Sequence, residues 1–82
     1  MTYHITLGVY PNGHWISNVV REKDLEDHIQ YNKTFRPGRL LYVDGQRVYD
    51  GIVKDCSKYD RVAAEFYKQH NIDMSKPTLP YT

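Results

Sequence analysis

Four histidines and a single cysteine are the residues of this chain that could bind a metal ion or serve as nucleophile and base. Structural zinc sites usually carry their ligands in pairs, such as C-x2–4-C or H-x3–5-H. Here the candidates are isolated in the sequence, at His4, His14, His28, Cys56 and His70. A fold could still assemble zinc ligands from Cys56, His28 and His70, and we keep this as an alternative while expecting no cofactor.

The residues that could act in catalysis lack the neighbouring sequence motifs that an active site needs. No glycine pattern that could form an oxyanion hole adjoins Cys56, and Asp55-Cys56-Ser57 is typical of a helix entry. The five glycines are single, so no phosphate-binding loop is present. Acidic residues gather in a pattern typical of a solvated first helical turn, at Glu22, Asp24, Glu26 and Asp27. We therefore expect a protein that is not an enzyme.

Arginines and tyrosines in the middle of the chain make the best candidate for a binding surface. Both residue types dominate interface hot spots, and both can also stack on bases or grip phosphates. We predict that the partner-binding residues are Arg36, Arg39, Tyr42, Arg47 and Tyr49. The alternative is that the arginines are solvated and that Tyr and Arg only pair across a hairpin, which contributes about 0.2–1 kcal/mol per pair.

Turn signals place these residues at the end of a helix and in a hairpin. Pro37 ends a helix that runs over about 24–35 and that Asp24 can cap. We expect an inward helix face of Leu25, His28, Ile29 and Asn32, with Phe35 at the end.

Asp44-Gly45 between two apolar runs predicts a type I′ hairpin. Its expected pairs are Val43 with Gln46, Tyr42 with Arg47, Leu41 with Val48, and Leu40 with Tyr49.

An alternating pattern predicts another hairpin near the start of the chain. A half-buried strand is indicated by apolar residues on one face, at Tyr3, Ile5, Leu7 and Val9. A two-residue Asn12-Gly13 loop would pair Tyr10 with Trp15 and Val9 with Ile16. A shift of one residue in this turn would exchange the two faces of the second strand.

A second helix is predicted from Ser57, with Asp60 in a pattern like a capping box. Its buried face should consist of residues that recur at helical spacing, namely Tyr59, Val62, Ala63, Phe66, Tyr67 and His70. Asn71 is predicted to end this helix in a left-handed conformation. The predicted fold is α+β with the order ββαββα, an antiparallel sheet with two helices on one face. We expect a single domain over residues 1–72 and an extended or frayed tail over 73–82.

Size and charge narrow the classes of partner. A single cysteine among 82 residues allows no internal disulfide, which favours a reducing, cytosolic compartment. The apolar runs are far shorter than the roughly 20 residues that span a bilayer, so no membrane partner is expected. Eleven basic and ten acidic side chains give a net charge of +1, which favours neither nucleic-acid binding nor mimicry of DNA.

The stretch from Tyr31 to Gly51 resembles small accessory proteins of phages and prophages that infect Gram-positive bacteria. The residues that carry the resemblance are Tyr31-Asn32-Lys33, Arg36-Pro37-Gly38-Arg39 and Tyr42-Val43-Asp44-Gly45, within about a quarter of the chain. The resemblance implies a stand-alone inhibitor of host defence, such as an anti-CRISPR protein, in the cytoplasm of the infected host cell. It assigns a role to no individual residue.

We therefore expect a non-enzymatic phage-type inhibitor that binds a host protein. The most concrete target is a Cas effector nuclease, blocked at a protein domain rather than through mimicry of DNA. One alternative is a small nucleic-acid-binding regulator that uses Arg36, Arg39 and Arg47, and the other is a small zinc-stabilised interaction domain. We expect a monomer or a weak homodimer.

Overall fold

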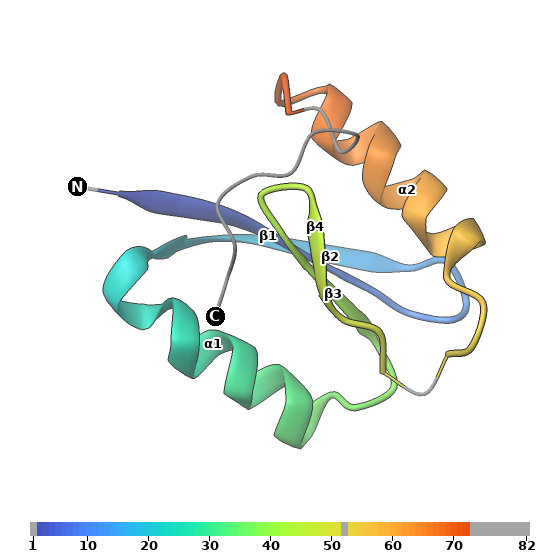
Figure 1. Cartoon of the computed structure of the whole chain (residues 1–82), viewed down its shortest axis with the longest axis horizontal. Helices are drawn as coiled ribbons and strands as arrows, with labels where there is room; N and C mark the ends of the chain where they lie inside the picture. Colours follow the sequence, from blue (N-terminus) through green and yellow to red (C-terminus); the bar gives the residue numbers. More distant parts are fainter. Residues whose placement is uncertain (1, 52, 73–82) are drawn as a thin grey trace.

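In the described part of the chain, four strands form one antiparallel sheet in the order β2-β1-β3-β4, and two helices accompany it. The computed structural model describes residues 2–51 and 53–72, so the tail predicted over 73–82 lies outside the described residues. The elements are β1 (Tyr3–Val9), β2 (Trp15–Arg21), α1 (Glu22–Phe35), β3 (Leu40–Val43), β4 (Gln46–Tyr49) and α2 (Ser57–Lys68). The predicted α+β class and the ββαββα order are confirmed (Figure 1).

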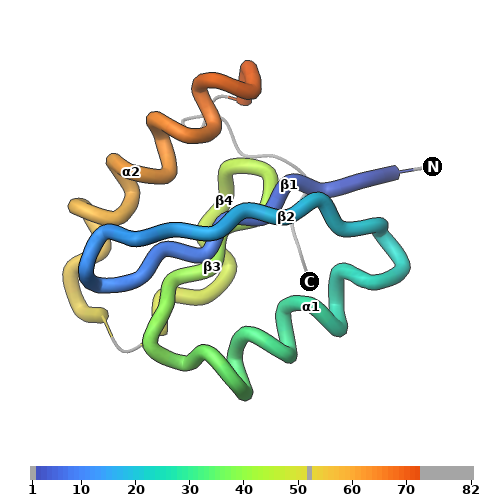
Figure 2. Tube along the Cα trace, turned by 180° about the vertical axis from the view of Figure 1, so that it is seen from behind, coloured from blue at the N-terminus to red at the C-terminus, as the bar shows by residue number. Residues whose placement is uncertain are grey.

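The two helices lie over opposite faces of the sheet, not over one face as predicted (Figures 1 and 2). Leu7 of β1 belongs to the same core cluster as Tyr67 of α2. The next residue, Gly8, faces the side chain of Arg39, which is hydrogen-bonded to Asn32 of α1. Neighbouring residues of a strand point to opposite faces, so each helix covers its own face. The prediction failed because the α1 side of β1 is largely polar, and apolar periodicity assigns polar residues to solvent.

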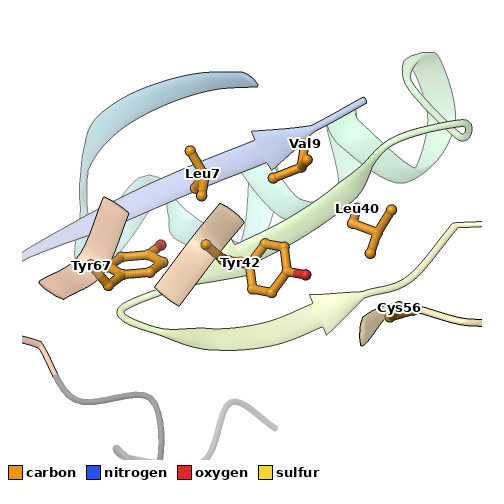
Figure 3. Close-up of a cluster of buried hydrophobic side chains, with 7 residues drawn as sticks. Leu7, Val9, Leu40, Tyr42, Cys56 and Tyr67 are labelled. Atoms are coloured by element: carbon orange, nitrogen blue, oxygen red, sulfur yellow. The ribbon is translucent and has the colours of Figure 1, made fainter. Parts of the chain in front are cut away.

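The central strand β1 is covered on both faces, although its alternation predicted a half-buried strand. From His4 to Val9 every residue except Ile5 is buried. The main apolar core lies between the sheet and α2 (Figure 3), and consists of Leu7, Val9, Leu40, Tyr42, Cys56, Ala63 and Tyr67. Buried Leu41 and Val43 point to the other face, because they alternate with Leu40 and Tyr42 along β3.

The first hairpin has a three-residue loop rather than the predicted two-residue loop. The N–H of Gly13 donates to the carbonyl of Tyr10 at 2.9 Å, and the N–H of Tyr10 donates to the carbonyl of His14 at 2.8 Å. Gly13 has a φ of 89°, the left-handed conformation that closes such a loop after a turn. The extra residue moves the pairing of the strands by one position.

This shift exchanges the two faces of β2. Val9 lies opposite Trp15, and Gly8 lies opposite Ile16, so the predicted pairs of Tyr10 with Trp15 and Val9 with Ile16 are wrong. Residues opposite each other share a face, which places Trp15 on the α2 side and Ile16 on the α1 side.

The second hairpin has the predicted type of turn. Asp44 and Gly45 have φ values of 49° and 87°, and the pairs of Val43 with Gln46 and Tyr42 with Arg47 are confirmed. Beyond them the register shifts, and Leu41 lies opposite Tyr49. The predicted pairs of Leu41 with Val48 and Leu40 with Tyr49 are wrong, because a bulge adds one residue on the β4 side.

Helix α1 begins at Glu22, directly after the last residue of β2 and two residues before the predicted start. Asp24 is not the cap, since it lies in the first turn and its carboxylate accepts a hydrogen bond from Nε of Arg21 at 3.1 Å. The predicted inward face holds for Leu25 and Asn32, which are buried, but Phe35 is exposed.

Helix α2 begins at Ser57 as predicted, but without the predicted capping box. The hydroxyl of Ser57 donates to Asp55 at 2.7 Å, and the N–H of Asp60 donates to the carbonyl of Cys56. The predicted left-handed conformation of Asn71 is confirmed by its φ of 60°. Neither helix in the described part of the chain has the length and apolar character needed to cross a membrane.

Candidate functional site

The five predicted partner-binding residues do not form one surface. Arg39 is 6% exposed and Tyr42 is 0% exposed. Arg39 lies on the α1 side of the sheet, and Tyr42 lies in the core on the α2 side. Neither side chain can be reached by a partner while the protein is folded.

Arg39 organises the polar layer between the sheet and α1. Its Nε donates to Oδ1 of Asn32 at 2.7 Å, and its Nη2 donates to the same oxygen. Its Nη1 donates to the hydroxyl of Tyr10 at 3.1 Å, and the guanidinium lies 5.4 Å from the centre of the Tyr10 ring. Burial, and then the positive charge of Arg39, lowers the pKa of His28. These contacts position α1 on the sheet.

Tyr42 and Arg47 share the carboxylate of Asp60 on α2. The hydroxyl of Tyr42 donates to Oδ1 of Asp60 at 2.6 Å, and Nη1 of Arg47 donates to both oxygens at 2.7 and 2.6 Å. Burial, followed by the hydrogen bond to Asp60, raises the pKa of Tyr42. The charge of Arg47 is thus used to attach β4 to α2.

Tyr49 and Arg36 lie at the end of the sheet where α1 ends. The hydroxyl of half-buried Tyr49 donates to the carbonyl of Pro37 at 3.1 Å. Arg36 is exposed, donates from Nη1 to the carbonyl of Phe35, and lies 6.0 Å from the centre of the Tyr31 ring. Of the five predicted residues, Arg36 is therefore the one with an exposed guanidinium that makes no ion pair among the described residues.

Tyr31, Phe35 and Arg36 form an exposed group that we call the α1-end cluster. Tyr31 is 49% exposed and Phe35 is 60% exposed, and their ring centres lie 5.0 Å apart. The spacing of four residues places both rings on one side of the helix. Pro37 then ends the helix, so the three side chains project together from a defined backbone.

A second exposed apolar region lies on β2, at one edge of the sheet. Its large apolar side chains are exposed on both faces, with Trp15 and Val19 on the α2 side and Ile16 on the α1 side. The ring of Trp15 lies 5.3 Å from the ring of Phe66 on α2. Sequence reasoning ranked the face around Trp15 and Tyr10 behind the arginines and tyrosines, and it did not identify β2 as an exposed edge. Apolar residues at both odd and even positions of the strand could have indicated this edge.

The alternative zinc ligands are not brought together. His28 lies on α1, whereas Cys56 and His70 flank the two ends of α2, about 20 Å apart at the rise of an α-helix. No group of three or more possible metal ligands occurs among residues 2–51 and 53–72. Burial also raises the pKa of the Cys56 thiol, which disfavours the reactive thiolate.

Comparisons with protein-family models, with curated proteins and with solved structures found no match to this chain.

Proposed function

We propose that this protein is a non-enzymatic inhibitor that binds a host defence protein through the α1-end cluster. The observation that carries the proposal is the exposure of Tyr31, Phe35 and Arg36 side by side at the end of α1. Tyrosine and arginine are enriched among the few residues that dominate binding energy at protein interfaces. A pair of rings fixed on a helix loses little conformational entropy when a partner covers it.

A protein partner fits the distribution of charge better than a nucleic acid does. Non-specific binding to nucleic acid depends on several cations that neutralise phosphates. Of the three arginines considered for that role, Arg39 is buried and Arg47 is paired with Asp60, which leaves Arg36. The net charge of +1 adds no attraction over the whole molecule.

The target that we propose is a Cas effector nuclease in the cytoplasm of the infected host cell. This part of the proposal rests on the resemblance of Tyr31–Gly51 to phage accessory proteins, a stretch that contains the α1-end cluster. A nearly neutral protein is a poor mimic of DNA, so inhibition would come from blocking a protein domain or its movement.

Substitution of the central ring tests the proposal. Phe35→Ala should weaken binding to the partner recovered from host lysate, or to a purified Cas effector nuclease, by about 30-fold, the effect of losing one hot spot. Arg36→Ala should weaken binding in the same direction. Affinity can be measured by calorimetry, and inhibition by cleavage of a DNA target.

The matched control is Thr34→Ala, an exposed position next to Phe35, which should bind like the wild type. Unchanged affinity for both Phe35→Ala and Arg36→Ala would reject the α1-end cluster as the binding surface. A gel shift that weakens steeply with salt, without any protein partner, would instead support a nucleic-acid-binding regulator.

A further inference from the structure

The two edges of the sheet differ in their protection against pairing with another strand. Proteins usually protect an edge by short length, charged side chains, proline or a bulge. The β4 edge has four residues, a bulge beside it and an exposed Arg47. The β2 edge has seven residues, and its single charged residue, Arg21, stands at the last position and is paired with Asp24. Protection is therefore present at β4 and weak at β2.

The backbone of β2 has a row of hydrogen-bonding groups that point away from β1. Hydrogen bonds join Tyr10 to His14 at one end of the hairpin and Thr2 to Glu22 at the other. In an antiparallel ladder, residue pairs that exchange hydrogen bonds alternate with pairs that do not. The even-numbered residues of β2 therefore bond to β1. The outward-pointing N–H and C=O groups are those of Trp15, Ser17, Val19 and Arg21.

Both faces of β2 leave room for another strand. Trp15 and Val19 are exposed on the α2 side, and Val19 is the most exposed large apolar residue of the described chain, at 68%. Ile16 and Asn18 are exposed on the α1 side. Neither helix therefore covers the approach to this edge.

We propose that β2 pairs with β2 of a second copy of this chain, antiparallel and about a two-fold axis at Asn18. The strand is nearly self-complementary around this residue. Ile16 and Val20 lie two positions before and after Asn18. Across the axis, Ile16 of one copy therefore lies opposite Val20 of the other copy, on the α1 side of the sheet. The four outward residues of each strand meet in pairs and form about eight backbone hydrogen bonds.

The ends of the paired strands are also complementary. Trp15 of one copy lies opposite Arg21 of the other in this register, an arrangement that allows a cation–π contact. The net charge of +1 on each copy causes little repulsion. An extended segment of an unrelated protein could bond to the backbone, but a second β2 also matches these side chains, which is why we assign the edge to a second copy.

Charge substitutions at the two-fold axis test this assignment. In the dimer the two Asn18 side chains lie opposite each other, about 4.5–5.5 Å apart at Cβ. Asn18→Lys and Asn18→Asp should each be monomeric, because each places like charges at this distance. An equimolar mixture of the two variants should form a heterodimer. The masses can be measured by sedimentation equilibrium.

The wild type should be dimeric at about 100 μM, where a micromolar Kd would give mostly dimer. Gln69→Lys, at an exposed position after α2, should remain dimeric and controls for the added charge. Ser17→Pro provides a second disruptive variant, because it removes an outward N–H that β1 does not use. Circular dichroism verifies that each variant is folded.

A monomeric wild type at this concentration would overturn the proposal. So would folded Asn18 variants that dimerise like the wild type, or a mixture that fails to associate. Loss of dimerisation with unchanged binding to a host protein would support the dimer and leave the α1-end cluster unaffected.

Discussion

The guanidinium of Arg39 occupies the space where a side chain at position 8 would begin. A Cβ built on Gly8 would lie 2.7 Å from Nε of Arg39, closer than real contacts allow. The guanidinium cannot easily move aside, because Asn32 and Tyr10 hold it in place. A glycine at this position thus allows a buried arginine to join the sheet to α1.

Gly8→Ala should therefore lower the free energy of unfolding by about 1–3 kcal/mol, as overpacking does. A loss of stability would be informative, because replacing a glycine within a strand by alanine otherwise raises the free energy of unfolding. Urea denaturation measures the effect, and Gly38→Ala, where a Cβ would meet no atom within 4 Å, is the control with a change below about 0.5 kcal/mol. In an Arg39→Ala background the cost of Gly8→Ala should disappear; an undiminished cost would refute the steric explanation.

The hydroxyl of Tyr42 makes stability depend on alkaline pH. Its pKa is raised in the folded protein by burial and by Asp60, so the folded state holds this proton more tightly than the unfolded chain. The resulting stabilisation is complete below about pH 10, the unfolded value, and is lost above it by up to about 1.4 kcal/mol per pH unit. Denaturation at about pH 8 and about pH 11 should show the wild type losing more stability than Tyr42→Phe. Equal losses in both proteins would contradict this assignment.

At the scale of elements, the turn between β3 and β4 joins the two hairpins. Asp44 accepts a hydrogen bond from the N–H of Ile5 at 2.8 Å, and its other carboxylate oxygen lies 2.6 Å from Nδ1 of His4. The turn of the second hairpin is therefore attached to the first strand, and a distorted turn should affect three strands together.

Gly45→Val should lower the free energy of unfolding by more than about 1 kcal/mol, because a β-branched residue is strained at its φ of 87°. Thermal or urea unfolding measures this effect. Gly38→Val serves as the control, since position 38 has open space around it and no positive φ. Equal stability of the two variants would show that turn strain does not limit the fold.

Local signals in the sequence predicted the helices, the strands and the second turn. They did not predict the number of residues in the first loop or the extra residue at the bulge. Alternation and helical spacing identified the strands and helices, and Asp44-Gly45 identified the type I′ turn. The three-residue loop that ends at Gly13 has nearly the same residues as a two-residue loop would, yet it exchanges the faces of β2. The bulge beside Leu41 likewise has no glycine or proline to mark it.

For the whole molecule, the sequence could not show which charged residues become buried. Arg36, Arg39 and Arg47 look alike in the sequence, yet one is exposed, one is buried beside Asn32 and one is paired with Asp60. The burial of Arg39 depends on the contact of α1 with the polar face of the sheet, and the pairing of Arg47 depends on the position of α2 beside β4. Hydrophobic periodicity reports neither contact. The predicted patch was therefore reduced to Arg36 and its aromatic neighbours.

The unlike edges of the sheet also decide how far assembly can proceed. A sheet with two open edges can add copies without end and grow into a fibril. Pairing of β2 with β2 uses the open edge of both copies and leaves a short, bulged β4 at each outer border. The proposed dimer would be closed, because neither outer border would offer an open edge to a third copy, and it would not extend into an ordered aggregate.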